Sequence, residues 1–270
     1  RKTLPDIKVY MKKNYPELQF VKLLNDGMLY KTILVLNDKL KFPLVLKVFY
    51  KTDIEDKIRK IHDSEYEKLK ILQKNLFNIS TINIIPIIKL ENYERHSIIY
   101  RQYVGVDLKE RMYLMPYLTD IDKIWITFQL LDLFNNLNNN SVVHGDLKPE
   151  NILINPNLSV FVTDFAPYKP TYIPDNDITS YTYYFGSYDS DSMKGCYLAP
   201  ERLIEGKKLS EGNENFTCSS SMDVFSLGVI LAELFIETNL FDYASLLSYK
   251  KGNISMDDIS LILEKIPDKN

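Results

Sequence analysis

Short hydrophobic runs and polar gaps dominate the first hundred residues of the chain. Runs rich in β-branched and large apolar residues predict four strands, at 29–36, 44–50, 82–90 and 97–104. Asn37 and Asp38 make a natural turn between the first two runs. Residues 53–75 instead place apolar side chains near helical spacing among charged ones, which predicts a helix. This part of the chain is therefore expected to be rich in β-structure.

Helical patterns prevail after Asp107. One apolar stripe at helical spacing is formed by Ile121, Ile124, Trp125, Phe128, Leu131 and Phe134, and the asparagines at 138–140 end it. A second, more apolar helix is predicted over residues 224–235. Between them, the apolar runs 152–154 and 160–162 predict a β-hairpin, and a polar, tyrosine-rich segment fills residues 167–195.

These patterns predict an α+β protein of two lobes. Residues 1–104 should form a small β-rich lobe, and residues 105–270 a larger helical lobe, with the join near 104–107. The longest apolar stretch, residues 227–236, is interrupted by Glu233 and is far shorter than the roughly 20 residues that a membrane-spanning helix needs.

Composition narrows the range of functions. With 45% hydrophobic and 26% charged residues, the chain is close to the average of globular proteins, which excludes disordered, collagen-like and coiled-coil classes. The net charge is −3 and the isoelectric point is near 5.7, so nucleic acid is not expected as a partner. Cys196 and Cys218 match no metal-ligand spacing and are expected to be ordinary thiols.

The strongest chemical signal is the sequence HGDLKPEN at residues 144–151. An aspartate followed five residues later by an asparagine, on a loop between a helix and a hairpin, suits phosphoryl transfer. Asp146 would accept the proton of a substrate hydroxyl and Asn151 would hold a metal ion. The alternative is a polar loop that only caps the preceding helix.

Three further motifs follow in a fixed order. TDFA at residues 163–166 comes after a hydrophobic strand and places Asp164 where a magnesium ligand is needed. APE occupies residues 199–201, and DVFSLG opens the apolar helix at residues 223–228. In this order the segments resemble the protein-kinase motifs H-R-D-L-K-x-x-N, D-F-G, A-P-E and D-x-x-S-x-G. Some other two-lobed ATP-binding fold is disfavoured by that order.

The resemblance extends upstream. VLKVF at residues 45–49 is similar to the V-A-I-K strand, which makes Lys47 a phosphate ligand. Glu65 lies 18 residues later on the predicted helix, on the face that looks toward the strand, and is expected to pair with Lys47; Glu67 is the alternative. In kinases the APE glutamate pairs with a later arginine, but none follows Arg202, so the helical lobe is expected to be incomplete in this chain.

Several positions depart from the kinase pattern. Of the three glycines of the phosphate-binding loop only the central Gly27 remains, with Asp26 beside it. Ala166 replaces the last glycine of D-F-G and removes a flexible hinge. Gly145 replaces the usual arginine, and with it the cation that reads a phosphate on the activation segment. Switching by a phosphorylated loop is therefore not expected.

One kinase subfamily shares these oddities. The segments 100–104, 144–146, 164–174 and 196–202 resemble the kinase-like domain of the class III phosphatidylinositol 3-kinase regulatory subunit, the vacuolar-protein-sorting protein 15 type. The resemblance implies a serine/threonine-kinase-like subunit that assembles with the lipid kinase catalytic subunit and an associated autophagy subunit. It also implies a cytoplasmic protein that, in full length, associates peripherally with endosomal or autophagic membranes in vesicle trafficking.

The same resemblance implies a site for a purine nucleotide and magnesium. Asp146 and Lys148 are the expected catalytic residues, and Asn151 and Asp164 the metal ligands. The residues expected to bind the cofactor are Leu24, Gly27, Lys47, Glu65, Arg101, Gln102, Val104, Asn151 and Asp164. The chain is interpreted either as a working serine/threonine kinase or as a weak or inactive pseudokinase that serves as a nucleotide-bound scaffold.

The choice of base depends on Arg101, which falls at the position beside the C6 substituent of the purine. Adenine carries an amino donor there and guanine an oxygen acceptor, and arginine has only donors. Arg101 would then favour GTP over ATP. Alternatively, Arg101 turns away to pair with a carboxylate such as Glu65 or Asp164 and leaves the choice to the backbone at 102–104, so both ATP and GTP remain candidates.

Overall fold

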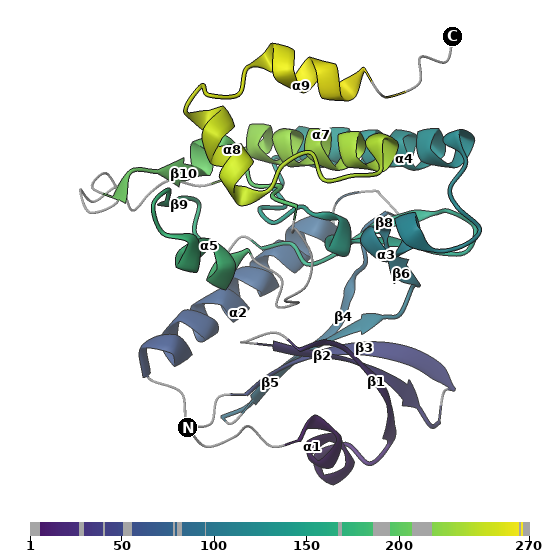
Figure 1. The fold of residues 1–270 in the computed structure, drawn as a ribbon. Coiled ribbons are helices and arrows are strands. Elements are labelled where there is room, and N and C mark those ends of the chain that lie inside the picture. The colour runs from purple at the N-terminus through teal and green to yellow at the C-terminus, as the bar shows by residue number, and fades with distance from the viewer. Residues whose placement is uncertain are drawn as a thin grey trace. The chain divides into compact units, whose positions relative to one another are not determined.

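The computed structural model describes residues 6–26, 30–39, 41–50, 56–77, 79, 83–94, 96–166, 169–185, 195–206, 218–264 and 266 (Figure 1). The chain forms two compact units. One combines Arg1–Phe77 with Ile85–Val104, and the other combines Asn78–Ile84 with Gly105–Asn270. No helix in the described part of the chain is both long enough and apolar enough to cross a bilayer.

The first unit is built on a five-stranded antiparallel sheet. Its strands are β1 (Leu18–Asp26), β2 (Tyr30–Asn37), β3 (Phe42–Tyr50), β4 (Ile87–Asn92) and β5 (His96–Gln102). They are ordered β1-β2-β3-β5-β4 across the sheet. The predicted strands at 29–36 and 44–50 and the turn between them are confirmed. The antiparallel sheet in this unit and the helices in the other confirm the α+β architecture of a kinase fold.

Helix α1 (Ile7–Asn14) covers one face of this sheet. Asp6 caps the helix by accepting the Lys8 N–H at 2.8 Å, and the fully buried Met11 packs into the core of the unit. The buried core residues are Met11, Leu18, Ile33, Val35, Leu44, Leu46, Val48, Ile98 and Tyr100. On β3 and β5 these residues alternate with side chains of the opposite face, which is the face available to a site.

Helix α2 (Asp56–Phe77) corresponds to the helix predicted over 53–75. Gln73 donates a hydrogen bond to the Ile87 carbonyl at 2.7 Å and ties the helix to β4. The predicted start of the next strand is wrong, because β4 begins only at Ile87. Pro86 has no N–H for a sheet, and before it Ile84 pairs with Val162 of the second unit, where Val162 donates its N–H to the Asn83 carbonyl at 2.7 Å.

The second unit begins with a short sheet and two helices. β6 (Val106–Asp107), β7 (Ile152–Ile154) and β8 (Val160–Val162) form a three-stranded antiparallel sheet, which confirms the predicted hairpin. Helix α3 (Leu108–Tyr113) follows β6, and α4 (Asp120–Asn139) leads to the loop before β7. The 3₁₀ turn η1 (Pro149–Asn151) closes that loop.

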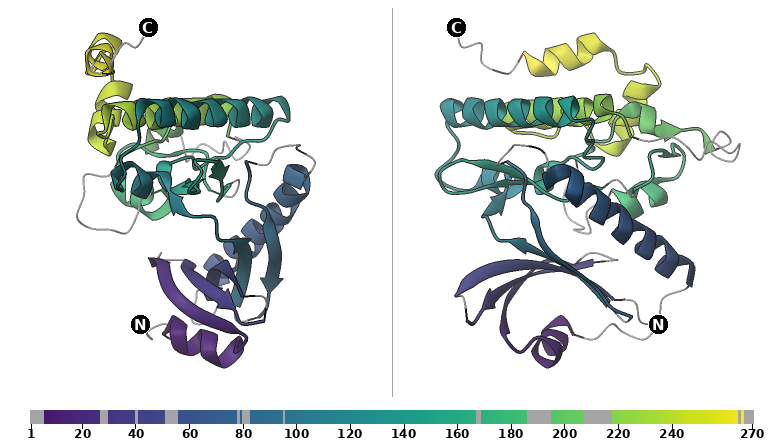
Figure 2. Two further views of the ribbon diagram at one scale, coloured as in Figure 1. Left: turned by 90° about the vertical axis from the view of Figure 1, so that its right-hand side faces the viewer. Right: turned by 180° about the vertical axis from the view of Figure 1, so that it is seen from behind.

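The apolar helix α7 (Ser220–Ile236) packs along α4 (Figure 2). β9 (Ile173–Pro174) pairs in parallel with β10 (Leu203–Ile204). Helix α5 (Ile178–Tyr184) follows β9 in the chain, and the 3₁₀ turn η2 (Pro200–Arg202) directly precedes β10. Helices α8 (Tyr243–Lys250) and α9 (Met256–Leu263) end the described part.

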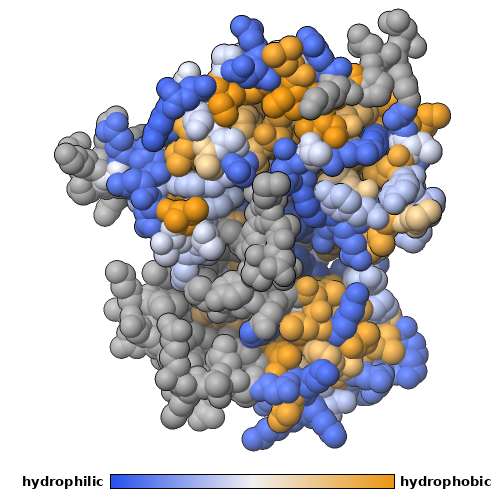
Figure 3. All heavy atoms as spheres, in the orientation of Figure 1, coloured by the Kyte–Doolittle hydropathy of each residue, from blue (hydrophilic) through white to orange (hydrophobic). Residues whose placement is uncertain are grey.

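The apolar stripe predicted on α4 faces away from the core. Ile121 is 78% exposed, and Ile124, Trp125, Phe128 and Leu131 are also exposed; of the six residues only Phe134 is buried. The buried face is instead formed by Lys123, Ile126, Leu130, Leu133, Phe134 and Leu137. The helix is thus apolar on more than one side. Elsewhere, exposed hydrophobic groups lie among hydrophilic ones, as on the face seen in Figure 3.

Candidate active site

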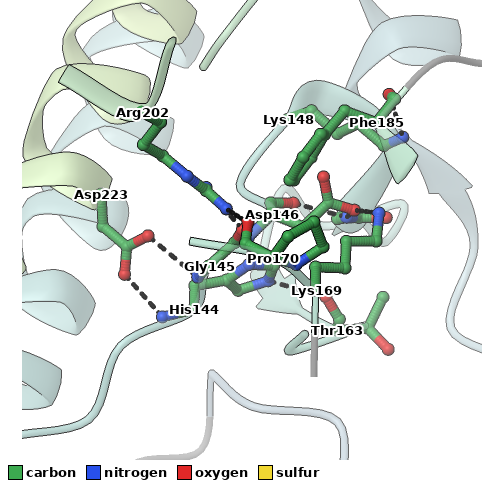
Figure 4. Close-up of polar contacts among 11 residues, drawn as sticks. His144, Gly145, Asp146, Lys148, Thr163, Lys169, Pro170, Phe185, Arg202 and Asp223 are labelled. Carbon is green, nitrogen blue, oxygen red and sulfur yellow. Dashed lines mark hydrogen bonds and ion pairs between the residues drawn. The ribbon is translucent and has the colours of Figure 1, made fainter. Parts of the chain in front are cut away.

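The catalytic-loop candidate, residues 144–151, is hydrogen-bonded to the first turn of α7. The buried carboxylate of Asp223, in the first turn of that helix, accepts the His144 N–H at 2.5 Å and the Gly145 N–H at 3.0 Å (Figure 4). Both N–H groups are buried and would be costly to leave unpaired. The D-x-x-S-x-G aspartate therefore fixes the backbone immediately before Asp146.

His144 links this loop to the end of β8. Its fully buried ring accepts the Asp146 N–H at Nδ1 and lies 2.9 Å, through Nε2, from the Thr163 carbonyl. Nε2 therefore carries the ring proton and donates it to Thr163. Burial lowers the pKa of His144 below its ordinary value, so the ring is neutral at physiological pH. It also packs on Phe165, with 4.6 Å between ring centroids.

Asp146 and Asn151 lie together within the loop. The Asn151 side-chain amide donates to the Asp146 carbonyl at 2.7 Å and to its carboxylate oxygen Oδ2 at 3.3 Å. Burial alone would raise the pKa of Asp146, but the ammonium groups of Lys169 and Lys148 outweigh it and lower the pKa. The pKa of Lys148 is raised despite burial by the charge of Asp146. Asp146 is therefore an ionised base candidate with Lys148 nearby.

Asp164 follows β8 and is brought to the loop by backbone hydrogen bonds. The Thr163 N–H donates to the Asn151 carbonyl at 3.0 Å, and the Ala166 N–H donates to the His144 carbonyl at 2.8 Å. Asp164 itself has a left-handed backbone, with φ of 62°. This conformation is uncommon for an aspartate and places it in the class of strained residues that gather at functional sites.

The donor set at this position fits Mg²⁺. The Asn151 Nδ2 is used on Asp146, which assigns the amide oxygen Oδ1, with the Asp164 carboxylate, to the ligand role. Hard Mg²⁺ bound with a nucleotide needs only one or two protein oxygens, the rest coming from phosphates and water. In the described residues there is no group of three histidine, cysteine or acidic side chains that could hold a metal ion.

Gly145 is a glycine for a conformational reason. Its φ is +79°, and a Cβ there would lie 3.1 Å from the Ala166 carbonyl oxygen. A side chain would be strained in this conformation and crowded by the D-F-A segment. The arginine of the kinase pattern would therefore be strained at this position.

Two residues that the sequence analysis did not assign complete the cluster. Lys169 forms an ion pair with Asp146, with 2.6 Å between Nζ and Oδ2. Arg202, only 3% exposed, donates to the carbonyls of Gly145, Pro170 and Thr171 at 2.8–2.9 Å (Figure 4). The only signal in the sequence was an arginine directly after A-P-E in a chain that lacks the arginine of H-R-D.

A second buried cluster supports α7 away from the catalytic loop. Glu233, which interrupts the apolar stretch of the helix, is 1% exposed and accepts a hydrogen bond from the Tyr197 hydroxyl at 2.5 Å. Lys109 of α3 forms an ion pair with the same carboxylate and donates to Asn239 at 3.0 Å. This buried charge is therefore paired.

In the first unit, Lys47 and Arg101 lie on the same face of the sheet. Lys47 on β3 is opposite Ile99 and Arg101 on β5 is opposite Val45, and their chain neighbours Leu46 and Tyr100 belong to the core on the other face. Arg101 is buried. Its role beside the purine, and the alternative pairing with a carboxylate, both stay predictions.

The other residues of this unit that were predicted to bind the nucleotide lie near the ends of strands or outside the described residues. Leu24 is an exposed residue near the end of β1, Gln102 is the exposed last residue of β5, and Val104 is half-buried. Gly27 and the side chain of Glu65 lie outside the described residues, although the backbone of residue 65 is part of α2.

The sequence also matches known proteins. Residues 17–268 match the family model described as the protein kinase domain. The chain therefore belongs to the protein kinase family, whose domains bind a nucleotide with magnesium. This confirms the family that the motifs predicted.

Several relatives within the family carry the name VPS15. The chain is 34% identical to serine/threonine-protein kinase VPS15 of Arabidopsis thaliana over 227 residues, 83% of this chain and 14% of that protein. It is 32% identical to vps15 of Schizosaccharomyces pombe over 267 residues (98% and 15%) and 32% identical to VPS15 of Saccharomyces cerevisiae over 245 residues (89% and 16%). The chain thus spans about one seventh of the length of these relatives.

Proposed function

We propose that this chain is the kinase domain of a regulatory subunit of a class III phosphatidylinositol 3-kinase, and that it transfers the γ-phosphate of a purine nucleotide to Ser or Thr. The observation that supports this most is the hydrogen bond from the Asn151 amide to Asp146, in a loop to which the backbone of Thr163 and Ala166, on either side of Asp164, is also bonded. The predicted base and the two predicted oxygen ligands then belong to two segments that are bonded to each other, as phosphoryl transfer requires.

The chemistry assigns each residue a role. Asp146 accepts the proton of the substrate hydroxyl, whose oxygen forms a bond to the γ-phosphorus while the bond from that phosphorus to the bridging oxygen breaks. The products are a phosphoserine or phosphothreonine and a nucleoside diphosphate. The Lys148 ammonium faces the charge on the transferred group, and Lys47 holds the other phosphates. Bound Mg²⁺ would offset phosphate charge, with Asn151 and Asp164 as its protein ligands.

The second candidate is a nucleotide-bound scaffold with little phosphotransfer. It is favoured by the loss of two glycines around Gly27 and by Ala166, which is 1% exposed and fixed to the His144 carbonyl. Assembly with the lipid kinase catalytic subunit and peripheral attachment of the full-length protein to endosomal or autophagic membranes fit either candidate. The relatives named VPS15 support the regulatory role.

Single-turnover transfer from γ-labelled nucleotide with Mg²⁺ separates the two candidates. We expect the wild-type chain to phosphorylate a serine/threonine peptide library and Asp146→Asn to lose at least 100-fold of the rate, in the range of removing a general base. Asp132→Asn, on the exposed face of α4, is the matched control and should retain the wild-type rate. Equal rates for wild type and Asp146→Asn would leave the scaffold as the function.

The nucleotide preference has its own test. If Arg101 faces the purine, GTP should bind at least as well as ATP, because a guanidinium suits the O6 acceptor of guanine and repels the amino donor of adenine. A bidentate arginine–guanine contact is worth roughly 1–3 kcal/mol of discrimination. Titration of both nucleotides with Mg²⁺ should show this preference in wild type and its loss in Arg101→Leu. A clear preference of the wild type for ATP would contradict the proposal.

A further inference from the structure

Lys169 forms an ion pair with Asp146, the residue proposed as the catalytic base. Its ammonium lies 2.6 Å from Asp146 Oδ2, and both side chains are largely buried, with 16% and 10% exposure. The Asn151 amide lies 3.3 Å from the same oxygen. An oxygen that already accepts two hydrogen bonds, one of them from a cation, is poorly placed to accept a hydroxyl proton as well.

The position of Lys169 is fixed by its neighbours in the chain. The carbonyls of Pro170 and Thr171 both accept hydrogen bonds from Arg202, at 2.9 Å each, and the Lys169 N–H donates to the Ala166 carbonyl at 3.2 Å. The ends of this short segment are therefore tied on both sides of the Lys169 side chain. These hydrogen bonds fix the backbone from which the Lys169 side chain reaches Asp146.

Phe185, the residue directly after α5, contacts both Lys169 and Arg202. The Lys169 ammonium lies 5.0 Å from the centroid of its ring, and the Arg202 guanidinium lies 4.7 Å from the same centroid. Phe185 is buried, so both cation–π contacts are shielded from water. The two cations thus pack on the same aromatic ring, and this contact connects Phe185 to residues 169–171.

Arg202 also brings a cation to the position at which this loop lacks the arginine of H-R-D. An arginine would be strained at residue 145, and the Arg202 guanidinium bonds directly to the Gly145 carbonyl at 2.8 Å. The three acceptors of Arg202 described here are backbone carbonyls, which do not depend on any modification. The segment is consequently anchored by the chain itself and needs no phosphate for this purpose.

We propose that Lys169 is a built-in inhibitor of this kinase, which closes Asp146 to substrate hydroxyls, and that Arg202 is the positioning residue that keeps Lys169 there. The inference rests on the proposed phosphotransfer function. The chain is then a kinase held at low activity by an ion pair that a partner or substrate must displace. The opposite role is that Lys169 assists transfer by facing the phosphoryl charge, and the two roles predict changes of opposite sign.

The decisive experiment measures peptide phosphorylation by the 270-residue chain with Mg²⁺ and each of ATP and GTP. Lys169→Met should raise the rate about tenfold, since a charge-assisted hydrogen bond no longer has to be broken. Lys169→Met combined with Asp146→Asn should return to background, which shows that the gain acts through the base. Lys250→Met is the matched control, because Lys250 ties the same segment at Asp175 without touching Asp146.

The outcomes separate this inference from the proposed function. A wild type that transfers phosphate and a Lys169→Met variant that is equal or slower would overturn the inhibitory role alone. Absence of transfer in wild type and in Lys169→Met would overturn the kinase function and the inference with it. A rise in Lys250→Met equal to that in Lys169→Met would show general loosening of the segment and would also contradict the proposal.

A second measurement requires no activity. The rate at which an amine-specific reagent labels Lys169, followed by peptide mass spectrometry, should be low in wild type and rise several-fold in Asp146→Asn. Arg202→Lys keeps the charge but cannot reach three carbonyls, and it should raise Lys169 labelling as well. The exposed Lys251 should label equally in all variants. Unchanged labelling in Asp146→Asn would refute the contact, and unchanged labelling in Arg202→Lys would refute the positioning role.

Discussion

Arg202 and Gly145 are 57 residues apart in the sequence, yet the guanidinium of one bonds to the carbonyl of the other. The left-handed backbone at Gly145 disfavours any side chain there, and the arginine that follows A-P-E provides a charge instead. A kinase can therefore lose the arginine of H-R-D and still keep a cation at its catalytic loop. Here that cation binds the carbonyls of Gly145, Pro170 and Thr171.

The neutral ring of His144 makes stability depend on pH. Because burial lowers its pKa from the ordinary 6.5, the unfolded chain takes up a proton on this residue below pH 6.5 while the folded chain does not. The free energy of unfolding should therefore fall as the pH drops from 7.5 to 5.5, by at most about 1.4 kcal/mol per pH unit from this group.

Urea unfolding of wild type and His144→Asn at pH 7.5 and 5.5 measures this contribution. We expect the variant to be less stable at pH 7.5, because it loses the Thr163 and Asp146 contacts, and the difference to shrink at pH 5.5. A stability difference that is the same at both pH values would contradict a buried neutral histidine.

Candidate residues in local motifs were predictable, and those that depend on distant contacts were not. Asp146, Asn151 and Asp164 stand in short segments whose spacing is typical of kinases; Asn151 bonds to Asp146, and the backbone around Asp164 bonds to the same loop. Lys169 forms an ion pair with Asp146 from a different segment of the chain, whose next carbonyl, that of Pro170, accepts a hydrogen bond from Arg202. No pattern around residue 169 shows that contact, because it is produced by tertiary structure.

At the scale of elements, the same contrast applies. Strands β2, β3, β7 and β8 are compact apolar runs bounded by turns, and the sequence located each of them. β1 was missed because register shifts between Phe20 and Lys22 and between Leu23 and Asn25 break its alternation. The apolar stripe predicted on α4 does lie on a helix, but its residues are mostly exposed. Helical spacing identifies residues that share a face, and it does not show whether another element covers that face.

The ion pair between Lys109 and Glu233 joins α3 to α7 and predicts a stability effect. Lys109→Met leaves the buried Glu233 carboxylate with only Tyr197 among the partners described here, and we expect a loss of about 2–3 kcal/mol of unfolding free energy. Lys123→Met is the matched control. Its partner Glu237 is 71% exposed, so that loss should be about 1 kcal/mol or less.

Chemical denaturation of both variants tests the difference. Adding Glu233→Gln to Lys109→Met should recover part of the loss, because the unpaired charge is then removed as well. Equal losses in the two lysine variants would mean that burial of the partner does not decide the strength of these ion pairs.

At the scale of the whole molecule, the predicted site residues are divided between the two units. Lys47 and Arg101 belong to the sheet of the first unit, and Asp146, Lys148, Asn151 and Asp164 to the second. Because Asn151 and Asp164 are the predicted ligands of a metal bound with the nucleotide, a nucleotide should stabilise the folded chain in a way that depends on the metal. At 100 times its dissociation constant, a ligand adds about 2.7 kcal/mol.

Melting temperatures provide the measurement. ATP or GTP should raise the melting temperature of wild type with Mg²⁺ or Mn²⁺ but not with EDTA, and Asp164→Ala should remove the shift. Asp132→Ala, a surface substitution on α4, should keep it. The same rise with EDTA as with Mg²⁺ would exclude Asp164 and Asn151 as ligands of a nucleotide-bound metal.

Trp125 is the single tryptophan of the chain, and it lies on the exposed face of α4 with its ring stacked on Phe128. An indole that is 48% exposed in the folded protein already emits in a largely aqueous environment. Its fluorescence should therefore change little when the chain unfolds, and circular dichroism is the better signal for denaturation. The same indole becomes a sensitive optical probe of any molecule that covers α4, because its emission would then shift to shorter wavelength.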